Sequence, residues 1–277
     1  VLAVDDMSPA LWWLAGLTSV ADWIGSDEQY FPVEGGMEFS QVVEIAKSCL
    51  AEIGCVRPQI IPGLSFHDLF YDAQKPDVQF APNDMQSAAI AAITGSGVYV
   101  IEAPMGMGKT EAALGAAYQL LADGKANGIY FALPTQATSN RMHLRMAEFI
   151  KRIAPEVAGS RIIHGNSWLM DHSAALNPLA TSSDTAENDA RIGRDWFSSA
   201  KRALIAPFGV GTIDQALLGV VAAKHFFVRH FALAGKVVIL DEIHSYDLYT
   251  GTLIDRLIET LEGLGCTVIV LSATLSG

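Results

Sequence analysis

Short runs of Val, Ile and Leu alternate with helical stretches through the carboxyl two thirds of the chain. The runs cover residues 97–102, 128–133, 161–164, 203–206, 236–241 and 267–272. Strands that are apolar almost throughout and are separated by helices are typical of a parallel sheet covered on both faces. We therefore predict an α/β fold in which helices cover both faces of a parallel sheet.

The first part of the chain has longer apolar stretches instead. Residues 9–24 are mostly apolar and end at a glycine, which predicts a buried helix. Residues 38–54 predict a second helix, with Ser40 as its N-cap and Gly54 as its stop. We therefore expect a short all-α segment over residues 1–55.

Two segments lack periodicity. Residues 56–82 contain four prolines, and we interpret them as a linker, so that the α/β domain covers residues 83–277. Inside that domain, residues 171–200 are rich in Ser, Thr, Asp and Asn, which predicts an inserted loop.

Composition narrows the class of protein. Hydrophobic residues make up 51% of the 277 residues and charged residues 17%, which excludes a disordered chain. No apolar run approaches the roughly 18 residues that span a bilayer, so we expect no membrane partner. Three cysteines without CxxC spacing predict the reducing cytoplasm. The net charge of −12 argues against indiscriminate binding of polyanions, so a nucleic-acid partner must be argued from motifs.

A phosphate-binding loop is predicted where the first strand meets an alanine-rich helix, in the sequence EAPMGMGKT at 102–110. Gly106 and Gly108 let backbone amides face the phosphates of a nucleotide. Lys109 supplies a charge for the β- and γ-phosphates, and the Thr110 hydroxyl can ligate Mg²⁺. Ala103 stands where the usual pattern has glycine. The predicted ligand is ATP with Mg²⁺.

An acidic pair follows the apolar strand at 236–241. Asp241 and Glu242 are expected at the carboxyl edge of the sheet, where open α/β folds bind ligands. Asp241 would hold Mg²⁺ through its water shell, and Glu242 would polarise the water that attacks the γ-phosphate. His244 belongs to the same box and is our candidate for linking the nucleotide to the end of the last strand.

Small hydroxyl residues end that last strand. Ser272 and Thr274 could hydrogen-bond the acidic pair and pass its state to a bound nucleic-acid strand. Taken alone, this ending is commonplace. It becomes specific as the third motif after the phosphate loop and the acidic pair.

These three motifs, in this order, resemble the first RecA-like domain of superfamily-two helicases. The resemblance covers about residues 80–277. It implies that Gln86, which lies 23 positions before the loop lysine, reads adenine. It also implies nucleic-acid contacts by Thr135, Arg141 and Thr212, through a hydroxyl or a guanidinium group on phosphate.

Three further segments resemble, more narrowly, the CRISPR-associated helicase-nuclease of type I interference systems. They are residues 14–26, 206–217 and 240–247. In that family the first segment closes an HD-type nuclease domain, so residues 1–55 are expected to be its helical carboxyl-terminal remnant. Asp22 would then complete a transition-metal site. No histidine precedes His67, however, so the partners of Asp22 are missing, and a helix-capping or paired acid remains its alternative.

The resemblance implies an ATP-dependent single-stranded DNA translocase or helicase, coupled to a metal-dependent HD nuclease that degrades CRISPR-targeted DNA. A crRNA-guided surveillance complex would recruit the enzyme in antiviral defence. We expect this chain to be an incomplete portion. Without arginines from a second RecA-like domain, hydrolysis can fall by about 10³–10⁵. The alternatives are a DEAH-like RNA helicase outside CRISPR and a non-hydrolysing nucleotide-binding scaffold.

Overall fold

The computed structural model describes most of the chain. The described residues are 8–28, 30–32, 36–53, 55–71, 79–134, 136–158, 202–221, 225–243 and 248–273. Several predictions fall outside them, namely those for the strand at 161–164, the inserted loop at 171–200, Thr135, His244 and Thr274. The side chain of Arg141 also lies outside the described set, although its backbone is helical.

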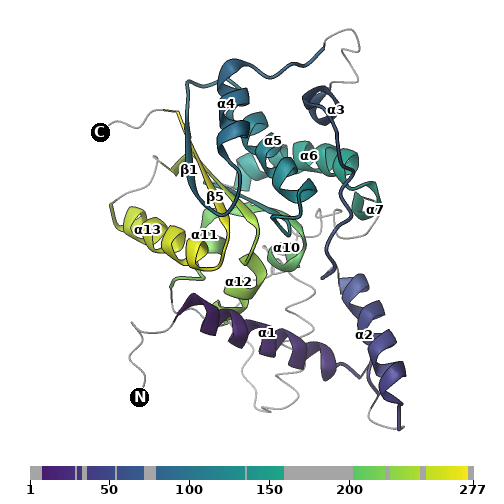
Figure 1. The fold of residues 1–277 in the computed structure, drawn as a ribbon. Coiled ribbons are helices and arrows are strands. Elements are labelled where there is room, and N and C mark those ends of the chain that lie inside the picture. The colour runs from purple at the N-terminus through teal and green to yellow at the C-terminus, as the bar shows by residue number, and fades with distance from the viewer. Residues whose placement is uncertain are drawn as a thin grey trace.

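Five parallel strands form one sheet in the order β1-β5-β4-β2-β3 (Figure 1). Their bounds are β1 (Gly97–Glu102), β2 (Ile129–Leu133), β3 (Phe208–Thr212), β4 (Val237–Asp241) and β5 (Thr267–Ser272). The predicted α/β architecture is confirmed. Because all neighbouring strands are parallel, the chain must cross over a face of the sheet between one strand and the next.

One predicted strand is wrong. The apolar run at 203–206 overlaps the short helix α10 (Arg202–Ile205), and β3 begins only after Pro207. The buried Lys236 explains the helix, because its Nζ donates hydrogen bonds to the carbonyl of Leu204 and, at 2.6 Å, to that of Ala206. A four-residue apolar run does not by itself distinguish a strand from a helix.

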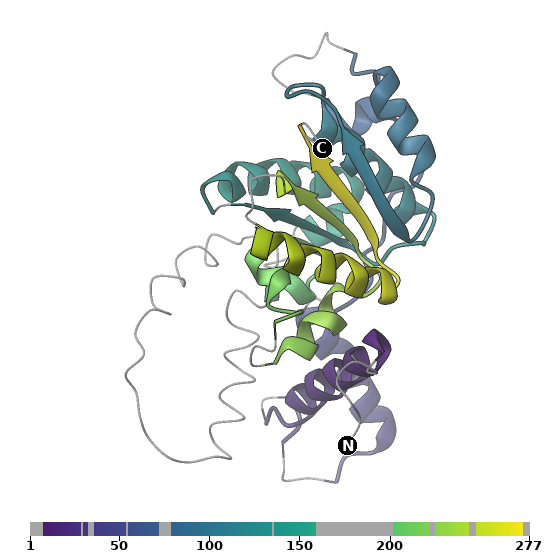
Figure 2. The ribbon, with the colours of Figure 1, turned by 90° about the vertical axis from the view of Figure 1, so that its left-hand side faces the viewer.

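Helices cover both faces of the sheet because its strands are apolar on both faces. Along β4, Val237 and Ile239 lie in one core cluster, and Val238 and Leu240 lie in the other. This alternation follows from the two-residue period of a strand. The first cluster includes residues of α5 (Lys109–Ala122) and α6 (Gln136–Ile153), with α4 (Asp84–Ala92) packed against it. The second includes residues of α11 (Ile213–Leu217), α12 (Phe226–Leu233) and α13 (Leu248–Gly263) (Figure 2).

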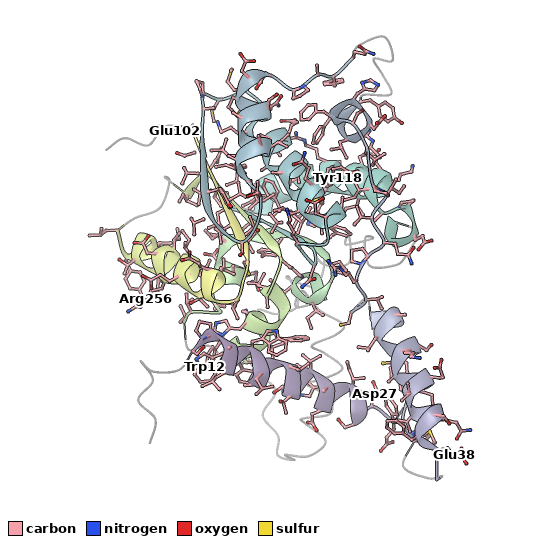
Figure 3. The ribbon with its side chains drawn as sticks, in the orientation of Figure 1. Trp12, Asp27, Glu38, Glu102, Tyr118 and Arg256 are labelled. Atoms are coloured by element: carbon pink, nitrogen blue, oxygen red, sulfur yellow. The ribbon has the colours of Figure 1, made fainter. Side chains whose placement is uncertain are left out.

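The predicted first helix is confirmed as α1 (Pro9–Gly25), and it packs on α12. Trp12 and Phe226 meet edge to face, with ring centroids 4.6 Å apart. Gly16 allows this close approach, since a Cβ there would lie 2.4 Å from the Phe227 carbonyl oxygen. Trp12 of α1 and Tyr118 of α5 lie on opposite sides of the sheet (Figure 3).

The second predicted helix is confirmed as α2 (Phe39–Ile53), but the predicted N-cap is wrong. Ser40 lies inside the first turn, and the Glu38 carbonyl accepts from the Val42 amide at 3.1 Å.

The segment after α2, which we interpreted as a linker, packs on the α/β domain where the structure describes it. It includes the short helix α3 (Phe66–Phe70), whose Leu69 is buried. The Tyr118 hydroxyl donates to the Ile61 carbonyl at 2.9 Å and accepts from the Leu64 amide at 2.7 Å. The linker itself stays a prediction.

Helix α7 (Pro155–Ala158) follows α6 after one residue and completes the helices of the described ranges. Across the described residues, no helix combines the length and the apolar character that crossing a membrane requires.

Candidate nucleotide-binding site

The topology brings the phosphate loop and the acidic pair to one edge of the sheet. The loop follows β1 and the acidic pair follows β4, while β5 lies between these two strands. In register, Glu102 pairs with Ser272, and Asp241 pairs with Leu271. All three strands are parallel, so their carboxyl ends meet there, as ligand sites of open α/β folds require.

Strand β5 also ties the starts of both motifs together. The amide of Ala103 donates to the Ser272 carbonyl at 3.3 Å, and the amide of Glu242 donates to the Leu271 carbonyl at 3.2 Å. Both loops therefore leave the sheet from fixed points on either side of one strand.

The phosphate loop has the backbone that its glycines predict. Gly106 and Gly108 have φ values of 81° and 79°, a left-handed conformation that favours glycine. Ala103 is not among the described residues with positive φ, so alanine fits there without backbone strain. Lys109 folds back on the loop, where its Nζ donates to the carbonyls of Ala103 and Pro104.

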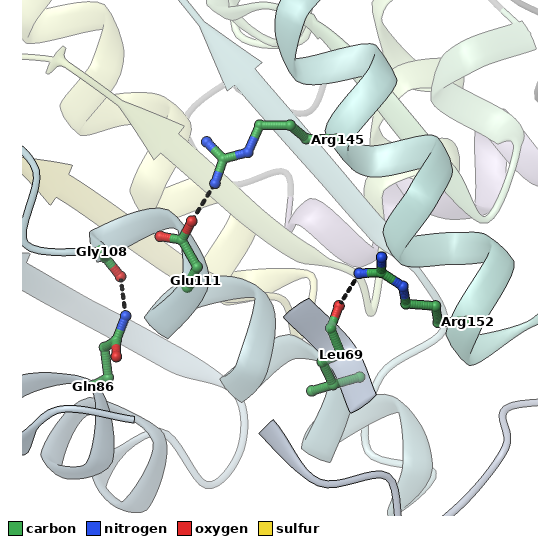
Figure 4. A network of polar contacts seen from close by, with 6 residues as sticks. All are labelled: Leu69, Gln86, Gly108, Glu111, Arg145 and Arg152. Atoms are coloured by element: carbon green, nitrogen blue, oxygen red, sulfur yellow. Dashed lines mark hydrogen bonds and ion pairs between the residues drawn. The ribbon is translucent and has the colours of Figure 1, made fainter. Parts of the chain in front are cut away.

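Gln86 fastens α4 to this loop (Figure 4). Its Nε2 donates to the Gly108 carbonyl at 3.1 Å, and its Oε1 accepts from the Asn83 amide at 3.0 Å. Asn83 in turn donates from Nδ2 to the Met107 carbonyl at 3.1 Å. The Gln86 Nε2 can still donate one more hydrogen bond, and its Oε1 can still accept one more. The reading of adenine stays a prediction, and the contact with the loop is an additional role.

The acidic pair is partly buried and surrounded by charge. Burial, followed by the negative charge of Glu242, raises the pKa of Asp241 to about 6, while the charges of Lys109 and Arg145 act to lower it. Glu242 has a φ of 53°, which is uncommon for a residue other than glycine and costs about 1–3 kcal/mol. The pair is thus held in place at a local energetic cost, as is frequent at functional sites.

Comparison with known proteins identifies this arrangement. Residues 83–277 match the family model described as DEAD/DEAH box helicase. The chain belongs to the DEAD/DEAH box helicase family. Residues 2–31 also match the model described as the HD domain of Cas3.

The relatives of this chain confirm the narrower resemblance. It is 39% identical over 272 residues to the CRISPR-associated endonuclease/helicase Cas3 of Thermus thermophilus, covering 94% of this chain and 29% of the relative. It is 31% identical over 284 residues to Cas3 of Escherichia coli, covering 99% and 31%. The chain thus spans less than a third of the length of these relatives.

Solved structures agree with the RecA-like fold of the chain. The crystal structure of T. fusca Cas3-AMPPNP is 32% identical, with a TM-score of 0.69 over 96% of this chain and 30% of that one. A pre-nicking structure of a CRISPR RNA-guided surveillance complex contains a chain that is 30% identical, with a TM-score of 0.56, covering 98% and 26%.

Other predicted site residues lie apart from the phosphate loop and the acidic pair. Thr212 ends β3, two strands away from β4, and is 8% exposed, so contact with a phosphate would require its exposure. Asp22 is exposed on α1. The described part of the chain contains no cluster of three or more metal-ligating side chains. Ser272, by contrast, is buried at the site, and its Oγ has no hydrogen-bond partner.

Sequence reasoning missed one pair of charged residues. Glu111, two positions after Lys109, forms an ion pair with Arg145 of α6 (Figure 4). The two residues are 34 positions apart and belong to none of the motifs. No sequence signal joins them, although an acid in the first turn after a phosphate loop could have prompted the search for a cation.

Proposed function

We propose that this chain contributes the ATP-hydrolysing core of a single-stranded DNA translocase or helicase that is coupled to an HD nuclease and degrades CRISPR-targeted DNA. The observation that carries the proposal is the placement of the phosphate loop and the acidic pair on either side of β5. Family membership and relatives named as nuclease/helicase support it.

ATP would bind at the amino end of α5. The amides around Gly106 and Gly108, with the positive end of the helix, suit a triphosphate, and Lys109 needs only to leave two carbonyls of its own loop to meet it. Thr110 and Asp241 would hold Mg²⁺. The pKa of Asp241 fits this role, because a buried carboxylate beside Glu242 gains from a neighbouring cation.

Hydrolysis would use Glu242 as the group that accepts a proton from the attacking water. Its amide is fixed to the Leu271 carbonyl, and its backbone is held in a left-handed conformation. Mg²⁺, when bound, supplies charge stabilisation for the phosphoryl oxygens. Ser272, with Thr274 and His244, would report the state of the acidic pair to the DNA, for which Thr135, Arg141 and Thr212 are the proposed contacts.

The amino-terminal helix would end the nuclease domain. Residues 2–31 match the Cas3 HD domain, and α1 packs on α12 through Gly16 and a Trp12–Phe226 contact. The nuclease would therefore be attached directly to the helicase domain. Asp22 would join a transition-metal site whose other ligands come from elsewhere in the protein. The proposed partner is a crRNA-guided surveillance complex, and the proposed location is the cytoplasm.

The decisive measurement is ATP hydrolysis by the full-length protein with single-stranded DNA, with RNA and with neither. We expect DNA-stimulated turnover that Lys109→Ala and Glu242→Gln both abolish. Lys125→Ala and Glu262→Gln are matched controls, since both residues are exposed and lie away from the site. Stimulation by RNA alone would favour the DEAH-like RNA helicase. No turnover would favour the non-hydrolysing scaffold.

A further inference from the structure

Glu111 places a carboxylate against the phosphate loop. It lies in the first turn of α5, and its Oε2 is 3.4 Å from the position that a Cβ on Gly108 would occupy. Its Oε1 pairs with Nη2 of Arg145 (Figure 4). The Glu111 side chain is 29% exposed, so solvent screens its charge incompletely.

A carboxylate in this place has two opposed effects. Negative charge in the first turn of a helix stabilises the helix, because it faces the positive end of the helix dipole. The same end of the helix is where a phosphate would bind, so an uncompensated carboxylate there repels the ligand. Arg145 cancels that charge. Its field also reaches Asp241, whose pKa it lowers.

Arg145 belongs to a helix that starts at the proposed DNA contacts. Helix α6 begins at Gln136, directly after the predicted contact Thr135, and Arg141 lies one turn before Arg145. The neighbouring Met142 and Met146 are buried in the same core cluster as the apolar residues of α5. Arg145 moves with α6 and Glu111 with α5, so a displacement of α6 relative to α5 would change the distance between the two charges.

The pair differs from other ion pairs of the molecule in what it joins. Lys47–Glu44 and Arg256–Glu259 each link residues three apart on one helix, with all four side chains at least 65% exposed. Glu111–Arg145 links two helices that cover the same face of the sheet. The geometry of this ion pair therefore depends on the position of α6 relative to α5.

We propose that the Glu111–Arg145 ion pair is a charge-compensating link that positions the phosphate loop for nucleotide and couples it to DNA bound along α6. With Arg145 in place, the loop accepts the triphosphate. When α6 shifts, the Glu111 carboxylate opposes it. Because coupling between two binding sites is reciprocal, nucleotide would change the affinity for DNA by the same factor. This inference rests on the proposed function.

The test is a titration of the full-length protein with a fluorescent ATP analogue, with and without a single-stranded DNA oligonucleotide. We expect Arg145→Gln to raise the Kd for nucleotide about fivefold or more, because it leaves the carboxylate uncompensated. Glu111→Gln should leave that Kd unchanged or lower it. The double variant should return to within about twofold of the original protein.

In all three variants the Kd should no longer depend on DNA. Arg145→Lys, which keeps the charge, should restore part of the dependence. Arg256→Gln is the matched control, because it breaks an exposed ion pair on α13, and it should change neither Kd nor its dependence on DNA.

The outcomes distinguish a failure of the proposed coupling from a failure of the proposed function. If both single variants weaken binding and the double variant is worse than either, the pair has a merely structural role and the inference is wrong. If the double variant keeps the full dependence on DNA, the inference is likewise wrong. If the unaltered protein does not bind the ATP analogue, or binds it with a Kd that Lys109→Ala leaves unchanged, the proposed function itself fails. The proposed coupling then fails with it.

Discussion

Lys109 and Asp241 follow strands on either side of β5, and the charge of the lysine acts to lower the pKa of the Asp241 carboxyl, which burial raises to about 6. Lys109 follows β1 and Asp241 ends β4, so the two residues are 132 positions apart in the sequence. They lie at the same edge of the sheet because β1 and β4 are the two neighbours of β5.

Gln86→Ala should weaken the binding of both ATP and GTP. The variant removes the hydrogen bond to the Gly108 carbonyl and leaves the capping partner Asn83 without its acceptor. Loss of a buried hydrogen bond costs about 1–3 kcal/mol, so each affinity should fall several-fold. Titration with both nucleotides checks this. A loss confined to ATP would mean that Gln86 reads adenine without supporting the loop. Ser87→Ala, at an exposed position of the same helix, is the control.

Ser272→Ala should reduce the stimulation of ATP hydrolysis by DNA while leaving the stability of the fold nearly unchanged. The Ser272 hydroxyl is buried and makes no hydrogen bond, so its removal should change the free energy of unfolding by no more than about 0.5 kcal/mol. DNA-stimulated ATP hydrolysis should nevertheless decrease if this hydroxyl engages the acidic pair. Thermal unfolding and ATPase assays on one preparation measure both effects. Unchanged stimulation would remove Ser272 from the coupling residues.

Gly16→Ala should loosen α1 from α12. The added Cβ would lie 2.4 Å from the Phe227 carbonyl oxygen and 2.7 Å from the Phe231 Cβ, so the helices must move apart. Overpacking of this kind typically costs about 1–3 kcal/mol. Thermal unfolding would report it. Gly25→Ala on the same helix meets no atom within 4 Å and should stabilise slightly. Equal melting temperatures for the two variants would contradict the close contact.

Stability should rise with pH between about pH 7 and 9 because of Lys236. Burial lowers the pKa of Lys236 from 10.5 to about 7, so in this range the unfolded chain binds the proton that the folded chain has released. A neutral amine keeps two N–H donors for the carbonyls of Leu204 and Ala206. The slope approaches about 1.4 kcal/mol per pH unit for one proton.

Denaturant unfolding at several pH values measures this slope, and Lys236→Met should flatten it while lowering stability overall. Above pH 9 the trend should reverse. Burial raises the thiol pKa of Cys55 and Cys266 from 9.0 to about 11, so the unfolded chain then loses protons that the folded chain retains. A stability that falls from pH 7 to 9 in the unaltered protein would contradict the burial of a neutral lysine.

Asp22→Ala should spare ATP hydrolysis and stop metal-dependent DNA cleavage by the full-length protein. Asp22 is exposed on α1, far in sequence from the phosphate loop, and we propose that it is a ligand of the nuclease metal. Cleavage and ATPase assays should be run together. Glu28→Ala is the control, since this acid is also exposed and follows the same helix. Cleavage that survives Asp22→Ala unchanged would remove this residue from the nuclease site.

The sequence predicted more of the candidate site than of the packing around it. Gly106, Gly108 and Lys109 carry a local pattern, because a phosphate loop is made by consecutive residues. The partners of Gln86 could not be predicted in the same way. Its contact with the Gly108 carbonyl depends on where α4 lies on the sheet. Likewise, nothing in the sequence indicated that Thr212 would be buried.

The sequence by itself determined the elements with a strong local signal: strands β1, β2, β4 and β5, the first two helices, the phosphate loop and the acidic pair at the end of β4. Tertiary structure decided that residues 202–205 form a helix capped by Lys236, and that Glu111 meets Arg145. The physical reason is the range of the interactions. Periodicity and backbone conformation depend on neighbouring residues, whereas charge pairs and buried hydrogen bonds depend on strand order and helix packing.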